Sequence, residues 1–311
     1  MFRLSQVEVK PGRWLIPSHL PFCLCYNPGV LIDFHTHVFA PEVIRNRERY
    51  LQADSGFAAL YARPSSRLAT ADELVDSMDE NGIDMSMVCG FGWTRQEICD
   101  EANNYIVECI ARYPKRLIGM ATLRPEAGDA ALYELEHCAK GGIRGIGEMR
   151  PPSASLDTSF DSLWTPIVKF LIERGLICLF HASEPVGHPY PGKSDLTPQV
   201  LYPFIMRYPG LKIILAHWGG GMPFYALMSE VKKALANTWF DTAASPFLYD
   251  PAIYRPAIDI VGAEHILFGS DYPLMPQSRA LREISSLNIP LEDRDRILGS
   301  NAQKLLEITG G

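Results

Sequence analysis

Residues 30–37 read VLIDFHTH, an apolar run that ends in two histidines. Side chains at alternate positions of a β-strand leave the same face, so a strand here places Asp33, His35 and His37 on one side. Two imidazoles about 7 Å apart along a strand can bind one cation, and imidazole suits zinc, iron, manganese or nickel. A doubly wound open sheet would normally carry a glycine-rich phosphate turn at this point. The histidines that replace such a turn favour a different fold of parallel strands.

Seven more apolar or β-branched runs follow, at residues 83–89, 117–123, 143–149, 176–180, 211–216, 239–243 and 265–268. Helical periodicity fills the intervals, at residues 70–80, 94–113, 125–140, 160–174, 198–208, 223–236, 251–261 and 278–287. Strands that alternate with helices imply a parallel sheet, because each crossover returns the chain to the same end. Eight alternations predict that this sheet closes into an α/β (β/α)8 TIM barrel.

The domain organisation follows from the position of the first run. Residues 1–29 contain four prolines and no clear periodicity, so we expect an N-terminal arm. Residues 30–311 are expected to form one catalytic barrel domain, because barrels of this class run as single domains near 250 residues and above. A closing helix is expected at residues 301–308.

Composition excludes several classes of protein. The formal net charge is −7 and no run of Lys and Arg stands out, which argues against nucleic-acid and anionic membrane partners. No apolar run reaches 18 residues, and the N-terminus lacks the order of a signal peptide. The seven cysteines are scattered and odd in number, as expected for buried reduced thiols. A cytoplasmic protein is predicted.

Polar residues follow most of the predicted strands at the end where a TIM barrel carries its chemistry. Any one of them alone could be a core histidine bonded to a backbone carbonyl, or a helix cap. Burying all of them without a shared cation would be costly. We therefore predict a metal site on this rim, which carries His35, His37, Glu148, His181, His217 and Asp271.

These motifs, together with the segment ILGSNA at residues 297–302, resemble the amidohydrolase superfamily. The closer likeness is to its amidohydrolase-related branch (amidohydrolase 2), similar to aminocarboxymuconate-semialdehyde decarboxylase, and it covers residues 30–308. The resemblance implies a metal-dependent hydrolase type of TIM barrel with one divalent ion, usually zinc and sometimes manganese. It further implies the ligands His35, His37, His181 and Asp271, with His217 beside the bound water.

Glu148 departs from the simplest mononuclear pattern. Some members of the superfamily have a glutamate on strand four that bridges two metals, and Glu148 ends the fourth run. The alternative for Glu148 is a salt bridge to Arg144 or Arg150. The expected cofactor is therefore one divalent ion, or two ions if Glu148 bridges a second.

The metal site supports two reactions. A bound divalent ion lowers the pKa of water toward ~7, and Asp271 and His217 could then move the protons of a hydrolysis. Glu148 favours this first prediction, a hydrolase of a small ester, lactone or amide that carries an acidic group. The alternative is a non-oxidative decarboxylase (carboxy-lyase) of an aromatic or unsaturated acid, in which Asp271 or His217 protonates the carbon that loses CO2. A catalytically silent barrel that serves as a binding protein is a lesser alternative.

Four residues in the loops after the strands are candidates for binding an anionic small-molecule substrate. Arg95 and Arg150 follow strands two and four, and arginine grips a carboxylate bidentately. His188 and Tyr190 lie in a proline-rich loop after strand five. The alternative for each is an ordinary solvated surface. A homodimer is one option for the assembly.

Overall fold

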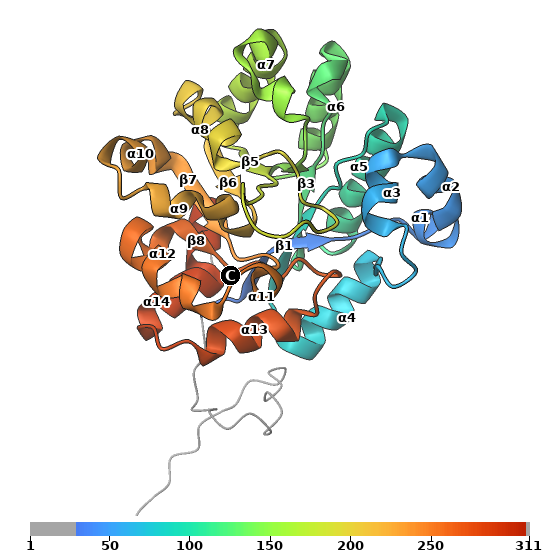
Figure 1. The fold of residues 1–311 in the computed structure, drawn as a ribbon. Helices are drawn as coiled ribbons and strands as arrows, with labels where there is room; N and C mark the ends of the chain where they lie inside the picture. Colours follow the sequence, from blue (N-terminus) through green and yellow to red (C-terminus); the bar gives the residue numbers. More distant parts are fainter. Residues whose placement is uncertain (1–28, 309–311) are drawn as a thin grey trace, which may run out of the picture.

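Eight parallel strands lie in chain order around one barrel in the computed structural model, which describes residues 29–308 (Figure 1). Each strand pairs in parallel with the next along the chain. Each also falls within or overlaps one of the eight predicted runs. The strands are β1 (Ile32–His37), β2 (Met85–Cys89), β3 (Leu117–Ala121), β4 (Gly145–Met149), β5 (Ile177–Phe180), β6 (Lys212–Leu215), β7 (Thr238–Asp241) and β8 (Ile266–Leu267).

Backbone hydrogen bonds connect the two ends of this sheet. The Phe34 N–H donates to the Phe268 carbonyl at 2.7 Å, and the Asp271 N–H donates to the His35 carbonyl at 2.9 Å. Farther along, the His37 N–H donates to the Tyr272 carbonyl at 2.7 Å. These bonds bring β1 beside β8 and the segment that follows it. The predicted (β/α)8 barrel is confirmed.

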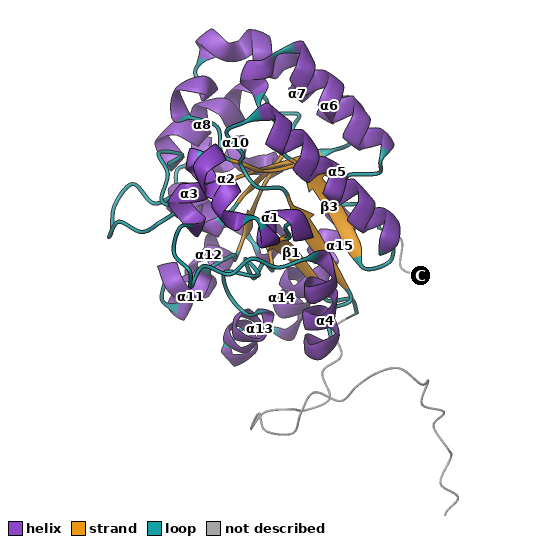
Figure 2. Cartoon of the chain, turned by 90° about the vertical axis from the view of Figure 1, so that its right-hand side faces the viewer, coloured by secondary structure: helices purple, strands orange, loops and turns teal. Residues whose placement is uncertain are grey.

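Helices surround the barrel on its outer face (Figures 1 and 2). Most of them lie where periodicity predicted a helix, and the predicted helix at residues 223–236 is divided into α9 and α10. The outer helices are α4 (Ala71–Asn81), α5 (Gln96–Arg112), α6 (Asp129–Lys140), α7 (Asp161–Glu173), α8 (Pro198–Arg207), α9 (Met222–Tyr225), α10 (Ser229–Ala234), α11 (Ser245–Leu248), α12 (Tyr254–Val261), α13 (Gln277–Ser286) and α14 (Leu291–Asp295). The last helix, α15 (Asn301–Leu305), lies within the predicted closing helix, and its Ala302 and Leu305 belong to the buried cluster inside the barrel.

Three short helices between β1 and α4 were not predicted. They are α1 (Pro41–Arg45), α2 (Arg47–Ala53) and α3 (Ser55–Tyr61), and they lie together at one side of the barrel (Figure 1). Aromatic side chains hold them there: the Phe57 ring stacks on Trp93 at 5.0 Å between centroids and lies 6.0 Å from Phe39. The insert thus packs on the loops that leave β1 and β2.

Apolar side chains fill two layers. Inside the barrel, Ile32, Met120 and Leu179 belong to one buried cluster, and a larger cluster lies between the strands and the outer helices. Within the described residues, no helix is both long and apolar enough to cross a membrane. The predicted arm at residues 1–29 lies outside the described residues except for its last residue, so the division into an arm and one barrel domain stays a prediction.

Candidate metal centre and active site

An irregularity in β1 turns both of its histidines toward the barrel mouth. Between Asp33 and Thr36 the register shifts, so that three steps along β1 match two along β2. One extra residue reverses the alternation of side chains. The Asp33 carboxylate therefore leaves the histidine face and accepts a hydrogen bond from Gln277 of α13 at 2.8 Å. The prediction that Asp33 shares a face with His35 and His37 is wrong for this reason.

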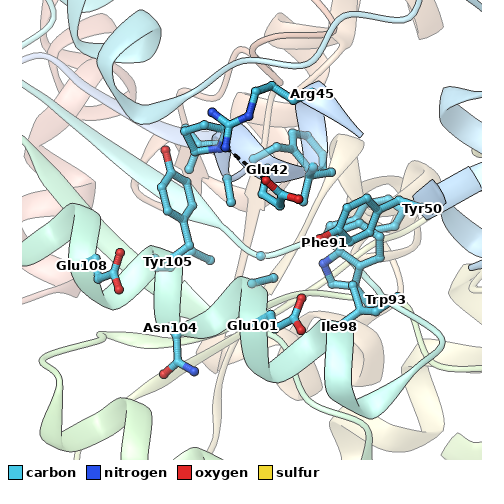
Figure 3. Close-up of a pocket in the computed structure, with 18 of the residues that line it drawn as sticks. Glu42, Arg45, Tyr50, Phe91, Trp93, Ile98, Glu101, Asn104, Tyr105 and Glu108 are labelled. Atoms are coloured by element: carbon cyan, nitrogen blue, oxygen red, sulfur yellow. Dashed lines mark hydrogen bonds and ion pairs between the residues drawn. The ribbon is translucent and has the colours of Figure 1, made fainter. Parts of the chain in front are cut away.

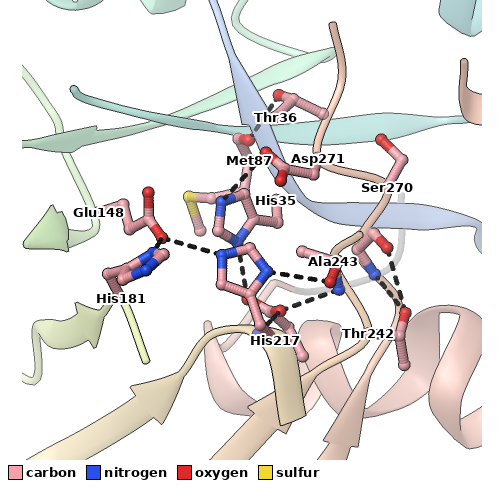
Figure 4. A network of polar contacts seen from close by, with 12 residues as sticks. His35, Thr36, Met87, Glu148, His181, His217, Thr242, Ala243, Ser270 and Asp271 are labelled. Atoms are coloured by element: carbon pink, nitrogen blue, oxygen red, sulfur yellow. Dashed lines mark hydrogen bonds and ion pairs between the residues drawn. The ribbon is translucent and has the colours of Figure 1, made fainter. Parts of the chain in front are cut away.

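His35, His37 and Asp271 form one buried triad at this mouth. Figure 4 shows two of its members, His35 and Asp271, close together. The Nε2 atoms of His35 and His37 lie 3.1 Å apart. Asp271 Oδ1 lies 3.4 Å from Nε2 of His37 and 3.8 Å from Nε2 of His35. All three ligand atoms lie within 4.8 Å of one another, so a single ion can contact them together.

Glu148, His217 and His35 form a second buried triad that shares His35 with the first. Glu148 Oε1 lies 3.3 Å from His217 Nε2, and Glu148 Oε2 lies 3.7 Å from His37 Nε2. The predicted alternative partner, Arg150, donates instead to the carbonyl of Gly192 at 2.6 Å. The Glu148 carboxylate is thus directed at the histidine cluster, and its metal role stays a prediction.

His181 lies beside these triads without joining either of them. Its Nδ1 contacts Glu148 Oε1 at 2.7 Å, and its Nε2 contacts Ser183 Oγ at 3.1 Å. The His181 and His217 rings lie 4.9 Å apart. Five of the six predicted rim residues are therefore brought together as possible metal ligands, and His181 reaches the cluster through Glu148.

Burial and mutual attraction shift the pKa values of the cluster in opposite directions. Burial and the charge of Arg150 lower the pKa of His181 to about 4. Burial alone would raise the pKa of Asp271, but a hydrogen bond with His37 and the nearby His35 and His217 lower it to about 2. Despite an equally unfavourable burial, Asp241 raises the pKa of His35 to about 10. Buried carboxylates that remain ionised require nearby positive charge.

The donor set fits a divalent metal. Two imidazole Nε2 atoms face each other at 3.1 Å beside a carboxylate, and both histidines are buried. Two protonated imidazoles would repel each other at this distance, whereas a cation can accept a lone pair from each. Imidazole and carboxylate ligands suit zinc and manganese, so the donor atoms alone leave open which of the two ions binds.

Sequence reasoning missed one carboxylate of this cluster, that of Asp241 at the end of β7. Its Oδ2 lies 2.8 Å from His35 Nδ1, and the residue is fully buried. The predicted seventh strand ran on to residue 243, which placed Asp241 inside the strand instead of at its end. On the other strands, the candidate site residues are polar residues at the strand end. The same criterion would have found Asp241, because β7 ends at this residue.

The four predicted substrate-binding residues divide into two pairs. Arg150 and Tyr190 are half-buried, and the Tyr190 hydroxyl donates to Glu184 Oε2 at 2.9 Å. Arg95 and His188 are exposed: Arg95 lies 3.6 Å from a Glu97 carboxylate oxygen, and the His188 ring lies 5.7 Å from that of Tyr190. The charge of Arg150 also acts on His181. Arg150 is therefore the best placed of the four beside the cluster.

A separate cavity of about 540 Å³ is lined by residues of α1 and α5 and by aromatic side chains such as Tyr50 and Phe91 (Figure 3). Its walls include Phe39, Tyr50, Trp93, Glu101 and Tyr105, and none of the histidines of the cluster lines it. Phe39, Tyr50 and Trp93 belong to the cluster that packs α1–α3 against the barrel. This cavity is distinct from the metal centre.

Comparison with known proteins identifies the family. A family model described as amidohydrolase matches residues 32–308. The chain is 24% identical over 314 residues to a gamma-resorcylate decarboxylase of Polaromonas sp., with 84% of this chain and 95% of the relative covered. It is 21% identical over 347 residues to a 2-amino-3-carboxymuconate-6-semialdehyde decarboxylase of Dictyostelium discoideum, with 88% and 91% covered.

The fold is also similar to that of a solved decarboxylase. A 5-carboxyvanillate decarboxylase from Novosphingobium aromaticivorans, complexed with manganese and 4-hydroxy-3-methoxy-5-nitrobenzoic acid, superposes with a TM-score of 0.73 at 18% sequence identity. The match covers 90% of this chain and 96% of that one. At this identity the similarity establishes the common barrel fold.

Proposed function

Because the chain belongs to the amidohydrolase family and is an enzyme of its amidohydrolase-related branch, we propose that it is a metal-dependent, non-oxidative decarboxylase of a small aromatic acid. The observation that carries this proposal is the buried triad of His35, His37 and Asp271 with His217 directly beside it. The names of both relatives support the reaction type. The manganese and nitrobenzoic acid bound by the similar structure support an anionic aromatic substrate.

These comparisons favour the decarboxylase alternative over the hydrolase that the sequence favoured. The argument for hydrolysis relied on Glu148 as a carboxylate that would help to generate hydroxide. In the structure, Glu148 Oε1 is engaged by His181 at 2.7 Å and by His217 at 3.3 Å. A carboxylate bound in this way can orient the histidines, and decarboxylation needs no attacking hydroxide.

His35, His37 and Asp271 would hold the metal, with Glu148 and His217 directed at the same space. When bound, a divalent ion supplies positive charge that attracts the carboxylate and hydroxyl oxygens of an aromatic acid. Either zinc or manganese meets this requirement. The protein residues then set the position of the substrate and supply the proton.

His217 and Asp271 are the proposed carriers of that proton. The Nδ1 of His217 contacts the carbonyl of Ala243 at 3.0 Å, which fixes the ring and leaves Nε2 directed at the cluster. In the proposed reaction one of these two residues takes up a proton, from solvent or from a phenolic hydroxyl of the substrate, and donates it to the ring carbon that carries the carboxylate. The bond from that carbon to the carboxylate then breaks, its electron pair restores the aromatic ring, and CO2 leaves.

Arg150 and Tyr190 are proposed to bind the substrate. Both are half-buried, and both belong to segments that follow strands of the rim. The guanidinium of Arg150 can pair with a carboxylate or phenolate oxygen. Arg95 and His188, which are exposed, are proposed to have weaker effects on substrate binding.

The test is a substrate screen on metal-loaded protein. We expect 2,6-dihydroxybenzoate or 5-carboxyvanillate to release CO2, with one solvent deuterium incorporated per turnover in D2O.

His217→Asn should retain metal and lose about 10²- to 10⁴-fold in kcat, because proton transfer contributes that much. His137→Asn, on the exposed face of α6, is the matched control. Turnover of lactones, esters or amides without CO2 release would instead support the hydrolase.

A further inference from the structure

Asp241 contacts the metal centre without belonging to either triad of possible ligands. Its carboxylate is fully buried and uses both of its oxygens. Oδ2 lies 2.8 Å from His35 Nδ1, while Oδ1 accepts hydrogen bonds from the backbone N–H groups of His217 at 2.9 Å and Ala243 at 3.0 Å. One side chain on β7 thus reaches both β1 and the segment after β6.

The contact with His35 determines which ring nitrogen is free. A carboxylate oxygen only accepts, so Nδ1 of His35 must donate its proton to Asp241. In the neutral imidazole, Nε2 then carries the lone pair, and Nε2 is the atom that belongs to both triads. A histidine bound to a metal commonly donates its other N–H to a carboxylate in this way.

The contact with His217 acts on the backbone. His217 has a φ of 56°, and Trp218 through Gly221 also have positive φ values. Residues other than glycine adopt this region only where surrounding contacts hold them. The hydrogen bond from the His217 N–H to Asp241 is such a contact, and it comes from the same carboxylate that orients His35.

We propose that Asp241 is a positioning residue that sets the tautomer of the metal ligand His35 and holds the backbone of the proton-transfer residue His217. It makes no direct contact with the metal or the substrate in this role. The inference rests on the metal dependence in the proposed function. It is independent of which reaction the metal supports.

The variant Asp241→Asn separates the two contacts. The amide oxygen can still accept from the His217 and Ala243 N–H groups, but the amide nitrogen would then face His35 Nδ1. Because that nitrogen donates, His35 would have to place its proton on Nε2, where it blocks the metal. We expect Mn²⁺ and Zn²⁺ affinities, measured by calorimetric titration of the metal-free protein, to fall about 10- to 100-fold.

Asp54→Asn is the matched control, because Asp54 is also fully buried and also accepts backbone N–H bonds, from Phe57 and Thr94. It should leave metal affinity unchanged whatever it does to stability. An Asp241→Asn protein that binds Mn²⁺ and Zn²⁺ as tightly as the wild type would overturn the proposal.

A second measurement decides the matter if Asp241→Asn does not fold. Long-range ¹⁵N–¹H spectra of the Zn²⁺-loaded wild-type protein report the tautomer of each histidine, and we expect a proton on Nδ1 of His35. Finding that proton on Nε2 would reject the proposal. A failure of the decarboxylase assignment would leave both the affinities and the tautomer as predicted here.

Discussion

His217, Trp218 and Asp271 all have left-handed backbone conformations, with φ of 56°, 58° and 67°. Such a conformation costs a residue other than glycine about 1–3 kcal/mol, and it persists only where neighbouring contacts impose it. The Asp271 N–H donates to the His35 carbonyl at 2.9 Å, while Asp241 holds His217. Two of these three residues are the proposed proton carriers. Their backbone conformations are thus held by β1, which supplies two of the metal ligands, and by Asp241 of β7.

The glycines after His217 are required by close packing as well as by conformation. Gly220 has a φ of 60°, and a Cβ at this position would lie 2.3 Å from the carbonyl oxygen of Ser183. Gly82, which follows α4, has nearly the same left-handed conformation, with φ of 67° and ψ of 27°, but a Cβ there would meet nothing within 4 Å. Alanine substitutions at these two glycines therefore separate the cost of conformational strain from the cost of steric overlap.

Gly82→Ala should lower the free energy of unfolding by about 1–2 kcal/mol, the cost of a left-handed alanine. Gly220→Ala should cost that amount and about 1–3 kcal/mol more, because backbone atoms beside His181 must move. Urea unfolding followed by circular dichroism measures both variants. Equal losses in the two variants would show that the contact with Ser183 carries no energetic weight.

At the scale of elements, the sequence predicted all eight strands because each is a buried apolar run that ends at the same rim. It did not predict the insert of α1–α3. The position of that insert depends on contacts distant in sequence, such as the bond from the Thr94 N–H to Asp54 Oδ2 at 2.7 Å. Periodicity cannot show such a contact. For the same reason, the bulge that separates Asp33 from His35 could not be predicted from regular alternation.

Asn103 makes long-range contacts of this kind, and their contribution to stability can be tested. It is 1% exposed on α5 and donates through Nδ2 to the Thr122 carbonyl and to Glu134 of α6, both at 2.9 Å. Its Oδ1 accepts from the Thr122 N–H at 3.0 Å. The side chain thus connects α5, the end of β3 and α6.

Asn103→Ala should lower the free energy of unfolding by about 1–3 kcal/mol, because buried polar groups of Thr122 and Glu134 would lose their partner. The neighbouring Asn104 is exposed and bonds only to His137 among the described contacts. Asn104→Ala should therefore stay within about 0.5 kcal/mol of the wild type. Chemical denaturation of both variants makes the comparison, and an Asn103→Ala protein as stable as Asn104→Ala would contradict it.

For the whole molecule, closure of the barrel is what assembles the candidate site. Its ligands come from β1, from β4 and from the segments after β6 and β8, which lie far apart in the sequence. The order of the strands could be predicted, so residues at strand ends could be assigned to one rim. The distances among them could not, and neither could the engagement of Glu148 by His181. The predicted homodimer and N-terminal arm stay predictions.

A metal held by residues from several strands stabilises the whole barrel, since the unfolded chain lacks the assembled site. Metal at 100 times its dissociation constant should add about 2.7 kcal/mol, which corresponds to an increase in Tm of about 4 °C for a chain of this size. Chelation should reverse the increase, and titrating Mn²⁺ or Zn²⁺ back should raise Tm with the logarithm of metal concentration. The control is a His35→Gln, His37→Gln double variant, whose Tm should not respond to the ion. A wild-type Tm that is equally indifferent to metal would exclude an ion bound across these strands.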